Sequence, residues 1–191
     1  MTRFVLGSLV FAVAISFQGL RADETKEEAK QPEKTVVVDS QAPNLQIKDS
    51  EGKLVDLKKL TAKGPVLVRL TCGCSGCDKE LAYFQSLHKA YEGKGLTSLA
   101  IFRMPDEKVE DYVKQKKLNM LYAVDKEGKS WSTFQTKTMP TNFLIEKGGR
   151  IRSIAAGCDP NGLIANILSE KVADLLGTET VELKKATPEE K

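Results

Sequence analysis

Histidine is almost absent from this sequence, and that scarcity limits the chemistry the chain can carry. The single histidine, His88, follows Cys77, the last of three clustered cysteines. If both residues lie on one helix, about 16 Å of helix axis separates them. His88 therefore cannot act as a base or a metal co-ligand for these cysteines, which argues against a copper chaperone. We expect His88 at the surface.

An excess of charge of one sign is also lacking. The chain has 29 lysines and arginines against 26 acidic residues, a net charge of +3. Arg3 and Arg21 fall in a segment that we expect to be removed, which leaves a still smaller excess. Such a balance gives no reason to expect nucleic acid or acidic lipid as a partner. The 191 residues are enough for one ordinary domain and contain no internal repeat.

No apolar run reaches the roughly 20 residues that span a bilayer. The run "FVLGSLVFAVAISF" at 4–17 follows a basic residue, and Ala22 then offers a small residue before a cut at Asp23. We therefore expect 1–22 to be a signal peptide. An uncleaved anchor is the alternative, and the only reason to expect contact with a membrane. No cysteine follows the run, which argues against a lipoprotein. The domain would then be periplasmic or otherwise extracytoplasmic, where disulfides persist.

Two charged segments bracket the part of the chain that has a core pattern. Residues 23–40 are predicted to be a solvated flexible linker, and residues 178–191 a disordered tail. Between them, residues 41–177 form one predicted domain. Its expected elements are a hairpin at 45–57, strands at 65–70 and 96–102, helices at 77–91 and 105–118, a strand–turn–strand at 141–156, and a helix at 161–177 ended by Gly177. This order predicts a mixed sheet covered by helices on both faces.

Three of the four cysteines fall within "TCGCSGC", and two of them form a C-x-x-C pair. Cys74 and Cys77 lie where a buried strand passes into a helix. The first N–H groups of a helix favour thiolate over thiol, so Cys74 is the expected nucleophile. Cys77, one turn further on, is the expected resolving thiol of a mixed disulfide. The sequence therefore predicts a thiol–disulfide redox pair.

The segments "PVLVRLTCGCSGCDKEL" and "MPTNFLIEKGGRI" resemble the thioredoxin fold, and specifically the exported TlpA/ResA-like thiol–disulfide oxidoreductases of the redoxin group. The resemblance covers about residues 41–177 and includes the N-terminal hairpin. It implies an enzyme that needs neither an organic cofactor nor a metal, and we expect a monomer. Its partners would be protein dithiols or disulfides and a thiol electron donor.

The same resemblance assigns further site residues. It implies a cis bond between Met139 and Pro140, with Met139, Pro140 and Thr141 beside the bound substrate strand. It also implies that Glu80, three positions after Cys77, carries the proton of the shielded thiol. The alternative for Glu80 is an acid that only stabilises the start of a helix.

The chain departs from the family pattern at three places. Gly73 stands where many members have an aromatic residue, Ser-Gly separates the paired cysteines, and Ala82 stands where proline is common. These departures leave the reduction potential and the substrate open. Arg69 interrupts the strand at 65–70 with a charge, and the sequence assigns it no functional role.

Cys72 and Cys158 are additional to the redox pair. The strands that precede them are expected to be parallel, so both residues should lie at the same edge of the sheet. Three uses remain open: a second disulfide or electron relay, a four-thiolate metal site together with Cys74 and Cys77, and passive packing.

Three other functions compete with the oxidoreductase. A thiol peroxidase is suggested by Thr71 and Cys74, which match T-x-x-C, although Leu67 stands where such loops carry proline. A thiolate metal-binding module is the second, and an adaptor with purely structural cysteines is the third.

Overall fold

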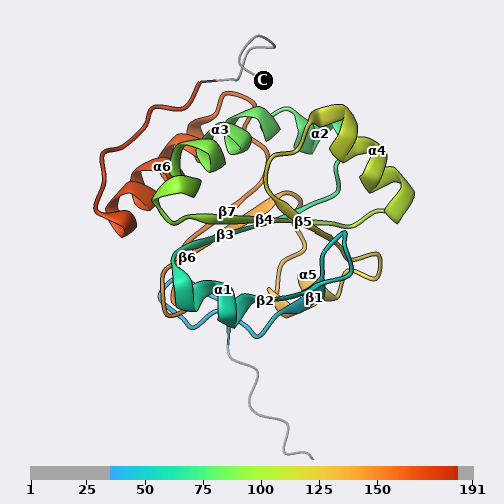
Figure 1. Cartoon of the computed structure of the whole chain (residues 1–191), viewed down its shortest axis with the longest axis horizontal. Helices are drawn as coiled ribbons and strands as arrows, with labels where there is room; N and C mark the ends of the chain where they lie inside the picture. The colour runs from blue at the N-terminus through green and yellow to red at the C-terminus, as the bar shows by residue number, and fades with distance from the viewer. Residues whose placement is uncertain (1–34, 185–191) are drawn as a thin grey trace, which may run out of the picture. The chain divides into compact units, whose positions relative to one another are not determined.

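A five-stranded mixed sheet forms the centre of the molecule in the computed structural model, which describes residues 35–184 (Figure 1). Its strand order is β5-β4-β3-β6-β7, and a separate antiparallel hairpin pairs β1 with β2. The predicted sheet and N-terminal hairpin are thereby confirmed. The strands are β1 (Gln46–Lys48), β2 (Leu54–Asp56), β3 (Val66–Thr71), β4 (Thr97–Phe102), β5 (Leu121–Val124), β6 (Thr141–Ile145) and β7 (Ile151–Ala156).

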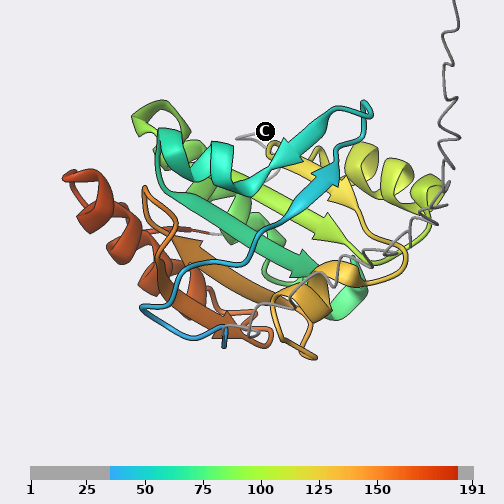
Figure 2. The same cartoon turned by 90° about the horizontal axis from the view of Figure 1, so that it is seen from below.

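Helices cover both faces of this sheet, as predicted. In Figure 1, α2, α3, α4 and α6 lie above it, while α1, α5 and the hairpin lie below, and Figure 2 shows the molecule from below. The helices are α1 (Leu57–Lys63), α2 (Ser75–Asp78), α3 (Leu81–Tyr91), α4 (Asp106–Lys116), α5 (Lys129–Thr133) and α6 (Leu163–Leu176), with a short 3-10 helix at Glu92–Lys94.

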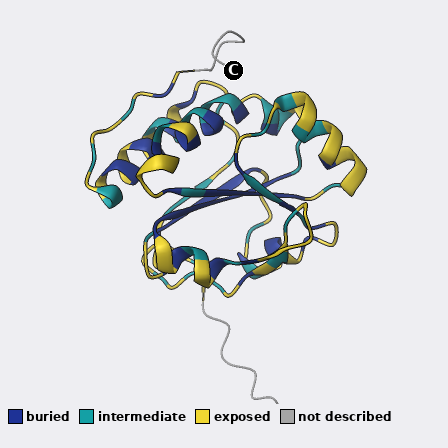
Figure 3. Cartoon of the chain, viewed as in Figure 1, coloured by how far each residue is buried: buried dark blue, intermediate teal, exposed yellow. Residues whose placement is uncertain are grey.

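Two hydrophobic cores lie on opposite faces of the sheet, and the buried strands between them are dark blue in Figure 3. Strand β3 is buried along its whole length. Because side chains alternate along a strand, Val68 and Leu70 join the core that contains Trp131, while Leu67 joins the core of α3 and α6. Arg69 shares the face of Leu67 and therefore points toward α3.

Strand directions bring the ends of distant segments together. β3 runs parallel to β4 and antiparallel to β6, which is antiparallel to β7. β3 and β7 are thus parallel to each other, as predicted, and their carboxyl ends share one edge of the sheet. The segments that follow them carry Cys72 and Cys158.

Helix α1 and strand β5 were not predicted. Helix α1 begins at the capping residue Asp56, whose carboxylate accepts a hydrogen bond from the backbone N–H of Lys59 at 3.2 Å. Strand β5 lies at one edge of the sheet, paired only with β4 among the five strands. The helix predicted at 77–91 is divided into α2 and α3, because the chain turns at Lys79 and Glu80.

The prediction of a surface histidine is wrong. His88 is 8% exposed, because α3 turns it toward the body of the protein. Its Nε2 lies 3.1 Å from a carboxylate oxygen of Glu92, one turn further along. Burial lowers the pKa of His88, so the neutral imidazole is favoured.

The segment after α6 is also more ordered than a free tail. The backbone of Leu183 exchanges two hydrogen bonds with the Asn166 side chain, and the Leu183 side chain is buried. Tyr91 accepts a hydrogen bond from the N–H of Val181 at 2.9 Å. Residues 178–184 therefore belong to the domain, and residues 185–191 lie outside the described part of the chain.

At the other end, ordered structure begins before residue 41. The N–H of Asp39 donates to the carbonyl of Ile151 at 2.8 Å, so this part of the expected linker is attached to β7. The expected signal peptide at 1–22 lies outside the described residues. Within residues 35–184, no helix is both long and apolar enough to cross a bilayer.

Candidate active site

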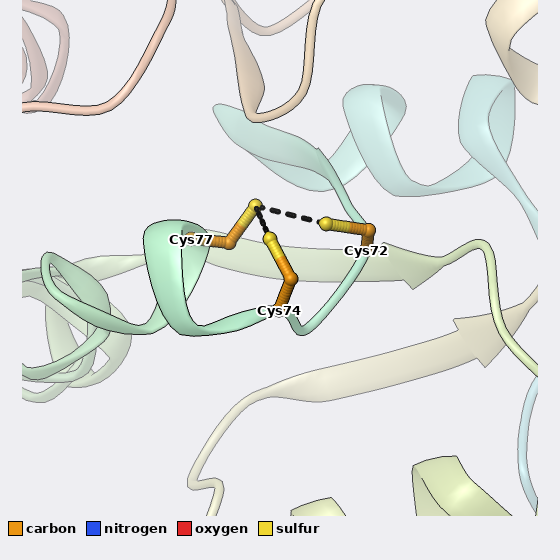
Figure 4. Close-up of side chains that lie close together, drawn as sticks. All are labelled: Cys72, Cys74 and Cys77. Atoms are coloured by element: carbon orange, nitrogen blue, oxygen red, sulfur yellow. Dashed lines mark hydrogen bonds between the residues drawn. The ribbon is translucent and has the colours of Figure 1, made fainter.

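Three cysteine sulfurs meet where β3 passes into α2 (Figure 4). Cys72 comes directly after β3, and Cys74 is the N-cap residue of α2. Gly73 between them has a φ of +62°, and a Cβ there would lie 2.4 Å from the Cε of Met104. The bend between the two cysteines therefore favours glycine, which accounts for the absence of an aromatic residue at this position.

Cys77 is the shared neighbour of the other two thiols. Its Sγ lies 3.4 Å from Sγ of Cys72 and 3.7 Å from Sγ of Cys74. Figure 4 shows both contacts converging on the Cys77 sulfur. Cys74 is exposed, Cys72 is half-buried and Cys77 is buried. This is the arrangement predicted for the pair: an accessible first thiol and a shielded second one.

The environment of Cys74 favours its thiolate. Its pKa is lowered to about 7, first by the Cys72 thiol and then by the backbone N–H of Cys77, with smaller help from the Cys77 thiol and the N–H of Gly76. The helix N-terminus thus contributes, as predicted, but the largest contribution comes from a neighbouring thiol. Burial raises the pKa of Cys72 to about 12, so Cys72 remains a thiol and a hydrogen-bond donor.

Cys158 lies near the pair but outside the three-sulfur group. Its Sγ donates a hydrogen bond to the carbonyl of Gly76, in the middle of the C-x-x-C segment, at 2.8 Å. Burial and the negative charge of Glu80 raise its pKa. The prediction that Cys158 lies at the active-site edge is therefore correct. Cys72, however, has its sulfur contact with Cys77.

A buried ion pair lies next to the cysteine segment. Arg69 Nη1 lies 2.7 Å from Oε1 of Glu80, and the two side chains are only 3% and 1% exposed. Arg69 also donates to the carbonyl of Cys77 at 3.2 Å and to Oδ1 of Asn142 at 2.9 Å. Its guanidinium stacks over the ring of Phe84. Arg69 thus fixes the backbone of Cys77, a role that sequence analysis missed.

Glu80 connects this ion pair to the segment of Cys158. Its second oxygen, Oε2, accepts a hydrogen bond from the backbone N–H of Asp159 at 2.8 Å. Both carboxylate oxygens therefore have partners that hold elements in place. The only sequence signals for this pair were a charge inside a buried strand and an acid eleven residues later, which become informative once the strand and helix are placed together.

The peptide bond between Met139 and Pro140 is cis, as predicted. Pairing of β6 with β3 sets Thr141 opposite Leu70, two residues before Cys72. Met139 is 38% exposed and Pro140 is buried. The Thr141 hydroxyl donates to the carbonyl of Thr138 at 2.8 Å, and its backbone lies in β6 between β3 and β7.

Two further acidic and hydroxyl groups have local structural roles. Asp78 of α2 accepts a hydrogen bond from the Tyr112 hydroxyl at 3.0 Å and pairs with Lys116 at 2.7 Å, which attaches α2 to α4. The Thr71 hydroxyl, expected at the reactive sulfur in a thiol peroxidase, accepts a hydrogen bond from the N–H of Gly73 at 3.3 Å.

The fold, the C-x-x-C pair at the start of a helix and the neighbouring cis-proline define a thioredoxin-fold thiol–disulfide oxidoreductase. More specifically, the chain belongs to the AhpC/TSA family, whose model matches residues 38–154.

Known relatives agree with this assignment. The chain is 33% identical over 147 residues to the thiol-disulfide oxidoreductase ResA of Bacillus cereus, covering 75% of this chain and 80% of that protein. It superposes with a TM-score of 0.63 on a solved candidate thioredoxin from Neisseria meningitidis, 26% identical, covering 75% and 95% of the two chains. A candidate thiol:disulfide interchange protein DsbE from Chlorobium tepidum gives 0.68 at 21% identity, covering 75% and 100%, and shows the fold.

Proposed function

We propose that this chain is an exported oxidoreductase that exchanges disulfides with protein substrates through Cys74-Ser75-Gly76-Cys77. The observation that carries the proposal is the pairing of an exposed thiol of lowered pKa with a buried thiol 3.7 Å away. In this arrangement the first thiol meets a large partner and the second is reserved for resolution.

Reduction of a substrate would proceed in two exchanges. The Cys74 thiolate attacks one sulfur of the substrate disulfide, forms a mixed disulfide and releases the other substrate sulfur as a thiolate. Cys77 loses its proton, attacks Sγ of Cys74 and releases the second substrate thiolate. Two electrons pass to the substrate, and the enzyme is left with a Cys74–Cys77 disulfide. An external thiol donor reverses that change.

We assign Met139, Pro140 and Thr141 to substrate binding, since the β6–β3 register puts them beside the cysteine segment. Glu80 is proposed as the proton carrier for Cys77. Its contacts with Arg69 and Asp159 also make it a positioning residue. Glu80→Gln should slow the resolving step and change its pH profile. Loss of stability without a change in that profile would limit Glu80 to a structural role.

A turnover assay tests the proposal. The purified protein should accelerate reduction of insulin disulfides by dithiothreitol, and Cys74→Ser should reduce the rate to the uncatalysed level. Cys158→Ser is the matched control and should retain activity, because that sulfur lies outside the three-sulfur group. An active Cys74→Ser variant would contradict the proposal. Peroxide consumption with the same donor would instead support the thiol peroxidase.

Export, a monomeric state and activity without a metal cofactor belong to the same proposal. Cleavage after Ala22 should give a mature chain that begins at Asp23, which mass spectrometry of protein recovered from an extracytoplasmic fraction would reveal. An intact N-terminus in that fraction would instead support the uncleaved anchor. Gel filtration should show the expected monomer.

Binding of a soft metal is the second candidate function, favoured by one observation. Sulfurs of Cys72, Cys74 and Cys77 all lie within 4.8 Å of one another, a group that excludes the Cys158 sulfur. Three thiolates suit copper(I) better than zinc, which takes four ligands in structural sites. One copper(I) bound per reduced chain, and lost on alkylation, would support this candidate.

A further inference from the structure

We propose that Cys72 is a second disulfide partner of Cys77, so that the site forms two alternative disulfides, Cys74–Cys77 and Cys72–Cys77. The inference rests on the proposed function, which supplies the first of these bonds. It assigns the third cysteine of the cluster to the redox chemistry itself.

The geometry gives Cys77 two possible disulfide partners. Its sulfur lies between the other two, and the contact with Cys72 is the shorter, 3.4 Å against 3.7 Å (Figure 4). Both are non-bonded contacts that must close to about 2.05 Å in a disulfide. The side of Cys77 that faces Cys72 is therefore as open to bond formation as the side that faces Cys74.

Access separates the two outer thiols. Cys74 is exposed and Cys72 is half-buried at the end of β3, behind the bend at Gly73. A protein substrate therefore meets Cys74 first. Cys72 is placed to act afterwards, within the oxidised enzyme, at a sulfur it already touches.

The exchange balances without an additional oxidant. Cys72 gives up its proton and attacks Sγ of Cys77 in the Cys74–Cys77 disulfide. A Cys72–Cys77 bond forms, the Cys74–Cys77 bond breaks, and its electron pair leaves on Cys74, which can take the proton. The oxidation level of the protein does not change. Cys74 can leave as a thiolate because the backbone N–H groups of Cys77 and Gly76 still stabilise its negative charge.

The exchange therefore moves the disulfide to the less accessible pair, Cys72 and Cys77, and leaves the exposed Cys74 as a free thiol. A centre with a Cys72–Cys77 disulfide keeps Cys74 free at the surface, where it can engage another partner. The shielded disulfide is less accessible to small thiols. Cys158 has no part in this exchange, since its sulfur is held on the Gly76 carbonyl.

Disulfide mapping of cysteine variants tests the inference. Full chains carrying Cys74→Ser with Cys158→Ser keep only Cys72 and Cys77. After equilibration with oxidised glutathione, alkylation and mass spectrometry, this double variant should bind two fewer alkyl groups than its reduced form and show a Cys72–Cys77 linked peptide. The paired variant Cys72→Ala with Cys158→Ser should form Cys74–Cys77 under the same conditions.

The two variants separate failure of the inference from failure of the proposed function. If the first stays reduced or only glutathionylated while the second forms its disulfide, the inference is overturned and the proposed function stands. If the second fails to form its disulfide, the proposed function falls, whatever the first does. Circular dichroism of both variants confirms that each is folded before the disulfides are counted.

Discussion

Individual residues in the cysteine cluster differ because of what surrounds them, and spacing shows only part of that difference. The C-x-x-C spacing and the strand before it were enough to predict that Cys77 is better shielded than Cys74. The contribution of Cys72 could not be predicted, because it depends on a bend at Gly73 that brings its sulfur back to Cys77. The ion pair between Arg69 and Glu80 could not be predicted either, because it depends on how β3 and α3 pack together.

The pKa of Cys74 sets the pH dependence of its reactivity. Its thiolate is favoured above about pH 7, so alkylation of the reduced protein by iodoacetamide should rise about tenfold per pH unit below pH 7 and level off above it. Cys72→Ala removes the largest cause of the lowered pKa and should move the curve to higher pH. Cys158→Ser is the control and should leave it in place. Coincident curves for all three proteins would disprove the role given to Cys72.

The buried Arg69–Glu80 pair should be costly to break. Arg69→Met leaves the Glu80 carboxylate buried without its cation, and we expect the free energy of unfolding to fall by about 3 to 5 kcal/mol. Lys114→Met is the control, since its pair with Glu110 is exposed and 3.9 Å long, and should cost under about 1 kcal/mol. Urea denaturation measures both. Equal losses of unfolding free energy in the two variants would show that the buried pair stabilises the fold no more than the exposed pair does.

At the scale of elements, hydrophobic pattern predicted the hairpin, the central strands and the long helices, while elements with weak patterns were missed. β5 has only four residues and α1 only seven. The division between α2 and α3 was also missed, because the apolar pattern continues across it. The break at Lys79 and Glu80 positions the acid toward Arg69, a tertiary effect that local pattern does not contain.

Close packing of two turns gives a test at this scale. A Cβ added to Gly64, after α1, would lie 2.6 Å from the backbone oxygen of Gly95, which cannot rotate away. We expect Gly64→Ala to lower the free energy of unfolding by about 1 to 3 kcal/mol. Gly93→Ala, where nothing lies within 4 Å, is the control and should be neutral or slightly stabilising. Thermal denaturation compares them, and an unaffected Gly64→Ala would show that these turns are not tightly packed.

At the scale of the whole molecule, alternation of strands and helices predicted the mixed sheet and its two covered faces correctly. The predicted domain boundaries were too narrow, because composition treats a charged segment as solvated even where a few apolar residues dock it. Val181 and Leu183 illustrate this, since their backbones bond to Tyr91, Ser169 and Asn166.

The docked segment after α6 should therefore contribute to stability. Leu183 is 5% exposed, and Leu183→Ala should lower the free energy of unfolding by about 2 to 4 kcal/mol. Leu163→Ala provides the control, because that side chain is 64% exposed and its loss should cost under about 0.5 kcal/mol. Chemical denaturation of both variants distinguishes a docked segment from a free one. A Leu183→Ala protein as stable as the control would support the disordered tail first expected.

The central claim is that Cys77 and Cys74 form a working redox pair, and equilibration with glutathione tests it most directly. The wild-type protein should show a reversible two-electron couple by mass spectrometry of alkylated cysteines, and Cys77→Ser should lose it, because every disulfide of the centre needs that sulfur. A potential near about −270 mV would indicate a reductase, and one near about −120 mV an oxidant. If Cys74 and Cys77 stay alkylatable at every glutathione ratio, the oxidoreductase account is wrong.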